Sequence, residues 1–202
     1  KLIDTGFTFR EVLDRPIKKV PSLIGQNIVN LFFENSTRTR ISFELAEKRL
    51  SADITNFSSG SSSVNKGEGL KDTIQNIHAM KMDCAVMRHP VSGSCLQLSK
   101  FVDAVVINAG DGTHEHPTQA LLDMMSLQEK FGKLKGLNIA IVGDILHSRV
   151  ALSNIYGLQK MGAKVTLCGP PHLIPRGIDE LGVSVNSDID EVIEWADALN
   201  VL

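Results

Sequence analysis

The sequence predicts an α/β protein in which parallel strands alternate with helices in two successive units. Short β-rich runs alternate with longer stretches at helical spacing, a pattern typical of parallel strands joined by helical crossovers. Most of the strand candidates are apolar throughout, as expected for a sheet that is covered on both faces. A segment rich in glycine and lysine separates the two units. We therefore expect a parallel-sheet domain followed by the first part of a second, doubly wound α/β domain.

Each expected element has a definite place in the chain. The strand candidates lie at residues 27–33, 84–88, 104–108, 138–142, 164–167 and 198–202. The helix candidates lie at residues 37–50, 69–82, 93–101, 116–131, 148–161 and 189–195. In the first helix candidate, an apolar stripe is formed by Ile41, Leu45, Ala46 and Leu50. We expect this stripe to pack on a sheet, with Glu44 and Lys48 paired on the outer side.

Two interruptions divide the pattern. Residues 57–69 (FSSGSSSVNKGEG) are too rich in serine and glycine for a regular element, and the stretch is longer than a usual connection. We therefore favour a mobile, functional surface loop over a passive linker. Residues 132–136 (GKLKG) precede a new strand, so we place a boundary near Lys133 between domains at residues 1–133 and 134–202. The last strand has no following crossover, so the chain is expected to be a fragment.

Composition excludes several classes of protein. The 202 residues are 43% hydrophobic and 22% charged, which suits a soluble protein with a buried core. The chain has 21 Lys and Arg and 23 Asp and Glu, so it has no overall positive charge that would attract nucleic acid or anionic membranes. Any anion site must therefore be local. The three cysteines are far apart and suggest neither disulfides nor a zinc cluster. Without a signal peptide or membrane-spanning run, a cytoplasmic location is expected.

The densest cluster of hydrogen-bond donors follows the first strand candidate, in the segment LFFENSTRTR. The strand ends at Phe33, and a helix begins with Ser36 or Thr37 as its N-cap. Free N–H groups and the positive end of the helix dipole then face out of the carboxyl edge of the sheet, where an anion binds readily. Further donors come from the side chains of Ser36, Thr37, Arg38 and Thr39, which we call the anion cradle. Phosphate binding is favoured over the alternative, a plain N-cap with solvated arginines.

Two further strand ends carry groups that can bind the same ligand. Arg88 ends its strand, so its side chain is expected at the edge where open α/β sheets bind ligands. After the next strand, GDGTHEHPTQALLD opens a helix at a proline and brings His116 and Gln119 to that edge, where they can share a ligand with the cradle. As metal ligands, His114 and His116 would lack a third partner at a suitable spacing. We therefore favour His116 as a hydrogen-bond donor.

The second unit opens with a strand that ends in Val142-Gly143-Asp144 and a helix that begins at Ser148-Arg149. This arrangement resembles a nucleotide-binding unit, but the GxGxxG fingerprint is absent, so no dinucleotide cofactor is expected. Arg149 is then available to bind a carboxylate.

Five motifs resemble those of the carbamoyltransferases, and specifically of aspartate carbamoyltransferase catalytic chains. They are FFENSTRTRISFE, SSSVNKGE, MRHP, HPTQALLD and VGDILHSRV, in the order of the family and over nearly the whole chain. The resemblance implies a carbamoyl-phosphate domain followed by the first part of an aspartate domain. The family's leading helix and its C-terminal stretch, which contains a further arginine motif for aspartate, are expected to be missing here.

The resemblance implies transfer of a carbamoyl group from carbamoyl phosphate to the amine of L-aspartate, a step of pyrimidine biosynthesis that yields N-carbamoyl-L-aspartate and phosphate. The anion cradle then binds the phosphate, while Arg88, His116 and Gln119 contact the carbamoyl end. Direct attack by the amine gives a tetrahedral intermediate whose oxyanion is stabilised by Thr39, Arg88 and His116. Positioning and charge stabilisation supply most of the acceleration, so neither a metal nor another cofactor is expected.

The resemblance also implies how subunits and domains cooperate. Lys66 and Arg149 bind aspartate, and the loop with Ser62 and Lys66 reaches into the active site of a neighbouring subunit. We therefore expect a homotrimer with shared active sites, to which regulatory or other partner subunits can bind. Glu34 is expected to pair with Arg149 and to hold the two domains closed.

Three alternatives stay open. Ornithine carbamoyltransferases share STRTR and HPTQ, but Lys66 and Arg149 suit an acidic acceptor rather than a cationic one. A non-catalytic phosphate-binding assembly protein is favoured by the truncated end and disfavoured by His116 and Gln119 beside the cradle. Nucleic-acid binding lacks both a basic track and a stacking platform. A chain without the missing parts can also bind carbamoyl phosphate without turning it over.

Overall fold

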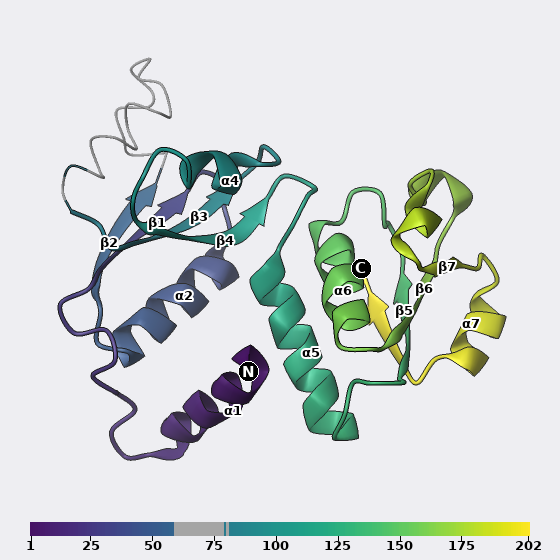
Figure 1. Cartoon of the computed structure of the whole chain (residues 1–202), viewed down its shortest axis with the longest axis horizontal. Helices are drawn as coiled ribbons and strands as arrows, with labels where there is room; N and C mark the ends of the chain where they lie inside the picture. Colours follow the sequence, from purple (N-terminus) through teal and green to yellow (C-terminus); the bar gives the residue numbers. More distant parts are fainter. Residues whose placement is uncertain (59–78, 80) are drawn as a thin grey trace. The chain divides into compact units, whose positions relative to one another are not determined.

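The computed structural model describes residues 1–58, 79 and 81–202 (Figure 1). Contacts between residues divide the chain into two units, one of Phe7–Gly112 and one of Lys1–Gly6 with Thr113–Leu202. Each unit contains its own parallel sheet with helices, so the predicted α/β class is confirmed. The helix α1 (Leu2–Arg10) and the short 3₁₀ helix η1 (Glu11–Asp14), which precede the first sheet, were not predicted from the sequence.

The unit Phe7–Gly112 is built on a parallel sheet with the strand order β2-β1-β3-β4. Its described strands and helices are β1 (Asn27–Phe32), α2 (Thr37–Arg49), β2 (Asp53–Ser58), β3 (Cys84–His89), α4 (Ser94–Leu98) and β4 (Val105–Asp111). Side chains of β1 alternate between two core clusters, because successive residues of a strand point to opposite faces. Leu31 packs with α4 on one face, and Phe32 packs with α2 on the other. The sheet is therefore covered on both faces, as expected for parallel strands.

The helix α2 is rotated relative to the sequence-based expectation. Ile41 and Leu45 of the expected apolar stripe are 46% and 44% exposed, whereas Glu47 is only 4% exposed. The side chain of Phe43 contributes to the cluster on this face of the sheet. Glu44 lies 3.5 Å from Arg40 in an ion pair, in place of the expected pair with Lys48.

A buried polar contact explains this rotation. The side-chain amide of Asn30, on β1, donates hydrogen bonds to Glu47 Oε2 at 2.9 Å and to Asn56 Oδ1 on β2 at 3.0 Å. Asn30 is 1% exposed, and a buried polar group strongly favours a geometry in which it is hydrogen-bonded. The helix therefore turns Glu47 toward the sheet, which apolar periodicity cannot reveal.

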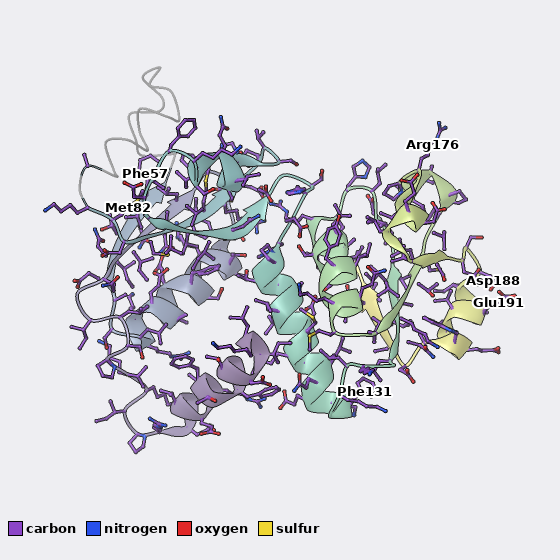
Figure 2. The ribbon with its side chains drawn as sticks, viewed as in Figure 1. Phe57, Met82, Phe131, Arg176, Asp188 and Glu191 are labelled. Carbon is purple, nitrogen blue, oxygen red and sulfur yellow. The ribbon has the colours of Figure 1, made fainter. Side chains whose placement is uncertain are left out.

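The second unit is also built on a parallel sheet, with the order β7-β6-β5-β8. Its strands are β5 (Asn138–Val142), β6 (Lys164–Cys168), β7 (Ser184–Val185) and β8 (Ala198–Val201). Its helices are α5 (Pro117–Phe131), α6 (Arg149–Lys160) and α7 (Ile189–Trp195), with the 3₁₀ turns η4 (Pro171–Leu173) and η5 (Ile178–Leu181). The carboxylate of Asp188 caps α7 by accepting hydrogen bonds from the N–H groups of Asp190 and Glu191. Figure 2 shows Asp188 and Glu191 beside each other at this helix start.

Helices α5 and α6 pack closely against each other in this unit. A Cβ atom added to Gly157 of α6 would lie 2.7 Å from the terminal carbon of Met124 on α5, so a larger residue here would require that flexible side chain to move. The contacts between residues divide the chain into two units before α5, between Gly112 and Thr113. The domain boundary expected near Lys133 lies after this helix. The boundary of 1–133 and 134–202 between independent domains stays a prediction.

Two short or polar edge strands were missed by the sequence reasoning. The strand β2 carries the sequence DITNFS and pairs only with β1 among the described strands, so it lacks the continuous apolar run of a central strand. The strand β7 has two exposed residues. Most of the expected helix 69–82 and most of the expected loop 57–69 lie outside the described residues, although Phe57 and Ser58 belong to β2.

Within the described part of the chain, no helix combines the length and apolar character needed to span a bilayer. All three cysteines are free thiols. Burial raises the pKa of Cys84 to about 11 and that of Cys95 to about 12. Because the thiolate is the reactive form, these side chains act as apolar packing groups at neutral pH.

The buried Glu47 predicts a pH-dependent stability. Burial raises the pKa of its carboxyl above the ordinary value of 4.5. The folded protein then binds more protons than the unfolded protein from pH 4.5 up to the raised pKa, so the free energy of unfolding falls as the pH rises through this window. Glu47→Gln cannot ionise, and we expect wild type to lose stability relative to this variant as the pH rises.

Urea unfolding over a pH series measures this difference. Glu47→Asp is the matched control, because it keeps the ionisable group but shortens its reach to Asn30. We expect this control to keep a pH dependence that Glu47→Gln loses. A constant difference in unfolding free energy between wild type and Glu47→Gln at all pH values would contradict the account.

Candidate functional site

The anion cradle lies where β1 turns into α2. Ser36 is the N-cap, with extended backbone angles of φ −154° and ψ 92°, and the N–H of Arg40 donates to its carbonyl at 3.1 Å. The Ser36 hydroxyl donates to Thr39 Oγ1 at 2.9 Å, and it accepts no capping hydrogen bond from a helix N–H within the described structure. The first N–H groups of α2 are therefore not used by their N-cap side chain, so they can serve an anion.

Arg88 joins this cradle from the neighbouring strand β3. Its Nη2 donates to Glu34 Oε1 at 2.8 Å, and its Nη1 lies 3.5 Å from Thr39 Oγ1 and 3.3 Å from the carbonyl oxygen of Ala109. The side chain of Arg88 is 12% exposed, so its charge is held close to the protein rather than in bulk water. Ser36, Thr39 and Arg88 thus form one continuous group of donors.

The sheet is irregular at the position of Arg88. Met87 pairs with Asn108, whereas His89 pairs with Asp111, so β4 has an extra residue beside Arg88. Gly110, within this irregularity, has φ 116°, a conformation that favours glycine. Such bulges redirect side chains next to binding sites.

The turn after Arg88 is held by a network around His89. The ring Nδ1 accepts a hydrogen bond from the N–H of Val91 at 3.0 Å and lies 2.9 Å from Ser94 Oγ. Burial lowers the pKa of His89, so the neutral ring is favoured with its proton on Nε2. The carboxylate of Asp111, 1% exposed, accepts hydrogen bonds from the N–H of Gly93 and from Asn108. This network fixes the end of β3 that carries Arg88.

His116 is the N-cap of α5, and Pro117 occupies the first turn, as the sequence predicted. The side chain of His116 is buried, with 8% exposure. Its backbone N–H donates to Ser153 Oγ on α6 at 2.8 Å, and the Ser153 hydroxyl donates to Glu115 Oε2. Contacts from α6 therefore fix the start of α5.

Gln119 belongs to a second network, centred on the carboxylate of Asp123. Gln119 Nε2 donates to Asp123 Oδ1 at 2.9 Å, one turn along α5. Asp123 Oδ2 accepts from Asn154 Nδ2 at 2.8 Å and from Asn200 Nδ2 at 3.2 Å. The side-chain amide of Gln119 is thus oriented by groups from α5, α6 and β8.

Arg149 is the first residue of α6 and lines an open pocket of about 700 Å³. Gln119 and Asp123 also line this pocket. The N-cap Ser148 accepts a hydrogen bond from the N–H of Ala151 at 3.3 Å, as expected for a helix that begins here. Asp144 and His147 also line this pocket and pair at 2.9 Å, and this hydrogen bond lowers the pKa of the Asp144 carboxyl.

The predicted site residues fall into three groups. Glu34, Arg88 and the anion cradle belong to the unit Phe7–Gly112, whereas His116, Gln119 and Arg149 belong to the other unit. Their expected convergence on one ligand, and the expected pair of Glu34 with Arg149, stay predictions. Ser62 and Lys66 lie outside the described residues. In the described part of the chain, no three His, Cys, Asp or Glu side chains are grouped so as to hold a metal ion.

Some residues of these networks were missed by the sequence reasoning. The contact of Asp123 with Gln119 could have been predicted, because Asp123 lies four residues later on a predicted helix and side chains at this spacing are neighbours. Asn154 and Asn200 had none, since they come from other elements and meet Asp123 only through the fold. His89 belongs to the motif MRHP, but the sequence gave no sign of its hydrogen bonds.

Comparison with known proteins identifies related chains. Residues 1–129 match the family described as aspartate/ornithine carbamoyltransferase, carbamoyl-P binding domain. The aspartate carbamoyltransferase catalytic subunit of Christiangramia forsetii is 61% identical over 201 residues, which are 100% of this chain and 65% of that protein. For Gemmatimonas aurantiaca, the subunit of the same name is 59% identical, with 100% and 63% covered. The chain therefore spans about 65% of the length of such relatives.

Solved structures are similar as well. The crystal structure of aspartate transcarbamoylase from Trypanosoma cruzi in complex with carbamoyl phosphate and aspartate matches with a TM-score of 0.89 and 33% identity. The match covers 98% of this chain and 70% of that one. The catalytic subunit of aspartate transcarbamoylase from M. jannaschii matches with a TM-score of 0.85 and 35% identity, over 98% and 67% of the two chains.

The cradle geometry predicts that Arg88→Lys weakens the binding of inorganic phosphate. A lysine keeps the charge but cannot contact Glu34, Thr39 and Ala109 through one planar fork. We expect a loss of roughly tenfold in affinity, equivalent to about 1.4 kcal/mol, measured by calorimetry.

Arg40→Lys is the matched control, because Arg40 is exposed, lies in the same segment and pairs with Glu44. Its affinity for phosphate should stay within about twofold of wild type, since a solvated charge contributes little through its geometry. An equal loss in both variants, or no loss in Arg88→Lys, would count against the cradle.

Proposed function

Because this chain belongs to the aspartate/ornithine carbamoyltransferase family, we propose that it carries the carbamoyl-phosphate site of an aspartate carbamoyltransferase. The proposed reaction transfers the carbamoyl group of carbamoyl phosphate to the amine of L-aspartate and releases phosphate and N-carbamoyl-L-aspartate. One observation supports it above all. The N-cap hydroxyl of α2 donates to Thr39 and accepts no hydrogen bond from a helix N–H in the described structure, and Arg88 reaches Thr39 beside it.

We assign the phosphate of the substrate to Ser36, Thr37, Arg38 and Thr39. Helix N–H groups and an arginine fork are suited to a phosphate dianion, because both direct several donors at its oxygens. The same donors stabilise the phosphate as it leaves. Since Arg38 is exposed, its side chain can reach a ligand at this helix end without crossing the core.

The carbamoyl end is assigned to Arg88, His116 and Gln119. Because Arg88 Nη1 also lies 3.5 Å from Thr39 Oγ1 in the cradle, we assign its guanidinium group to the phosphate as well. The neutral amine of aspartate attacks the carbonyl carbon, and the oxyanion of the tetrahedral intermediate accepts hydrogen bonds from Thr39, Arg88 and His116. The leaving phosphate takes up the proton of the amine. Positioned donors and two oriented substrates supply the acceleration, so this route needs no covalent bond to the enzyme.

Aspartate is assigned to Arg149 and Lys66. Arg149 lines the pocket that also contains Gln119, and a guanidinium group at this position suits the carboxylates of an acidic acceptor. This favours aspartate over the cationic side chain of ornithine. Lys66 is assigned from its motif alone, SSSVNKGE, because it lies outside the described residues.

We also propose the assembly that the motifs imply. In a homotrimer, the segment with Ser62 and Lys66 enters the active site of a neighbouring subunit, and Glu34 pairs with Arg149 when the two domains, 1–133 and 134–202, close. A catalytic chain of this kind can bind regulatory subunits, and we expect it in the cytoplasm. Sedimentation of the full-length protein tests the trimer, because a monomer would leave the shared site incomplete.

An activity assay tests the proposed reaction. The full-length protein is offered carbamoyl phosphate with either L-aspartate or L-ornithine, and the carbamoylated product is measured. We expect N-carbamoyl-L-aspartate only. Turnover of ornithine alone would assign the chain to the other acceptor, and binding of carbamoyl phosphate without any turnover would exclude an enzyme.

Two substitutions distinguish the proposed catalytic role of His116 from that of the nearby His114. His116→Ala should lower kcat by roughly 10²-fold to 10³-fold, because one oxyanion donor is lost. His114→Ala is the matched control, because His114 is exposed two residues earlier, and its kcat should change little. Similar kcat values for the two variants would refute the assignment of His116.

A further inference from the structure

We propose that Asp123 is a positioning residue that fixes which end of the Gln119 side-chain amide faces the substrate. Gln119 then presents its carbonyl oxygen, so the site recognises an N–H group rather than another acceptor. This inference rests on the proposed function, because it assigns the recognised N–H to the carbamoyl group. It adds a residue that does not itself touch the substrate.

The side chains of Gln119 and Asp123 are in direct contact. Gln119 and Asp123 lie one turn apart on α5, and Gln119 Nε2 donates to Asp123 Oδ1 at 2.9 Å. An ionised carboxylate only accepts hydrogen bonds. A flipped Gln119 would bring its carbonyl oxygen against Asp123 Oδ1, so two acceptors would meet at hydrogen-bond distance. The flipped orientation is therefore strongly disfavoured.

Asp123 is itself held in place by other side chains. Its other oxygen, Oδ2, accepts from Asn154 Nδ2 at 2.8 Å and from Asn200 Nδ2 at 3.2 Å. Asn154 lies on α6 and is fully buried, and Asn200 lies on β8. Donors from three elements thus occupy both carboxylate oxygens. Contacts from several elements of the fold therefore set the position of Asp123 Oδ1, the atom that accepts from Gln119.

The hydrogen-bond network around Asp123 lies at a pocket. Gln119, Asp123 and Asn200 all line the pocket of about 700 Å³ that also contains Arg149. Because Nε2 of Gln119 donates to Asp123, the planar amide directs its oxygen away from that carboxylate. An acceptor held in this way can receive a hydrogen bond from the amide nitrogen of a carbamoyl group.

A fixed acceptor on Gln119 affects which acyl phosphate the site selects. A carbamoyl group and an acetyl group are similar in size, but only the carbamoyl group carries N–H donors. A site built around a fixed acceptor rejects an analogue that lacks the donor, because the acceptor is then left unpaired. Asp123 therefore contributes to the choice of carbamoyl phosphate over acetyl phosphate.

The test compares two ligands in the full-length protein. The affinities of carbamoyl phosphate and of acetyl phosphate are measured by calorimetry for wild type, Asp123→Asn and Glu129→Gln. We expect Asp123→Asn to weaken carbamoyl phosphate about tenfold and to leave acetyl phosphate within about twofold, because an asparagine can direct its own NH₂ at Gln119 and allow the flip. Glu129→Gln, an exposed carboxylate on the same helix, should preserve the preference of wild type.

A second variant keeps the proposal testable if Asp123→Asn does not fold. Asn200→Ala removes one donor that holds Asp123, and we expect a loss of preference in the same direction, by about threefold. An equal weakening of both ligands, or an unchanged preference in the folded variants, would overturn the positioning role alone. Failure of wild type to bind carbamoyl phosphate would overturn the proposed function together with this inference.

Discussion

The parallel pairing of β1 with β3 is the constraint on which the candidate site depends. Phe32 pairs with Arg88 in this register, so the two strands end at the same edge of the sheet. The helix that follows β1 therefore begins beside the last residues of β3. This brings Thr39 Oγ1 to within 3.5 Å of Arg88 Nη1, although 49 positions separate the two residues in the chain. An anion site at this edge follows from topology before any individual side chain is considered.

Buried polar contacts then determine how the helices sit on their sheets. In the first unit, Asn30 draws Glu47 into the core and turns the apolar residues Ile41 and Leu45 outward. In the second unit, Asp123 accepts hydrogen bonds from three side-chain amides. Such contacts are specific because a buried polar group is costly when its hydrogen bonds are lost, so these contacts favour one rotation of each helix over others. Hydrophobic packing alone would allow several helix rotations.

Much of the fold follows from the sequence, because central parallel strands are short and apolar and because helix starts are marked by residues such as Ser36 and Pro117. The missed strands lie at sheet edges, where apolar runs are not needed. The rotation of α2 was predicted wrongly, since periodicity assigns apolar residues to the core and cannot anticipate a buried Glu47. The cradle was visible as a dense motif, whereas the network of Asp123 required contacts between distant elements.

We propose above all that the N-terminus of α2 and Arg88 together bind the phosphate of the substrate. A crystal structure of the full-length protein with inorganic phosphate tests it most directly. We expect a phosphate ion that accepts hydrogen bonds from the first N–H groups of α2 and from the guanidinium group of Arg88. A phosphate ion bound at another surface, with this helix end occupied only by water, would contradict it.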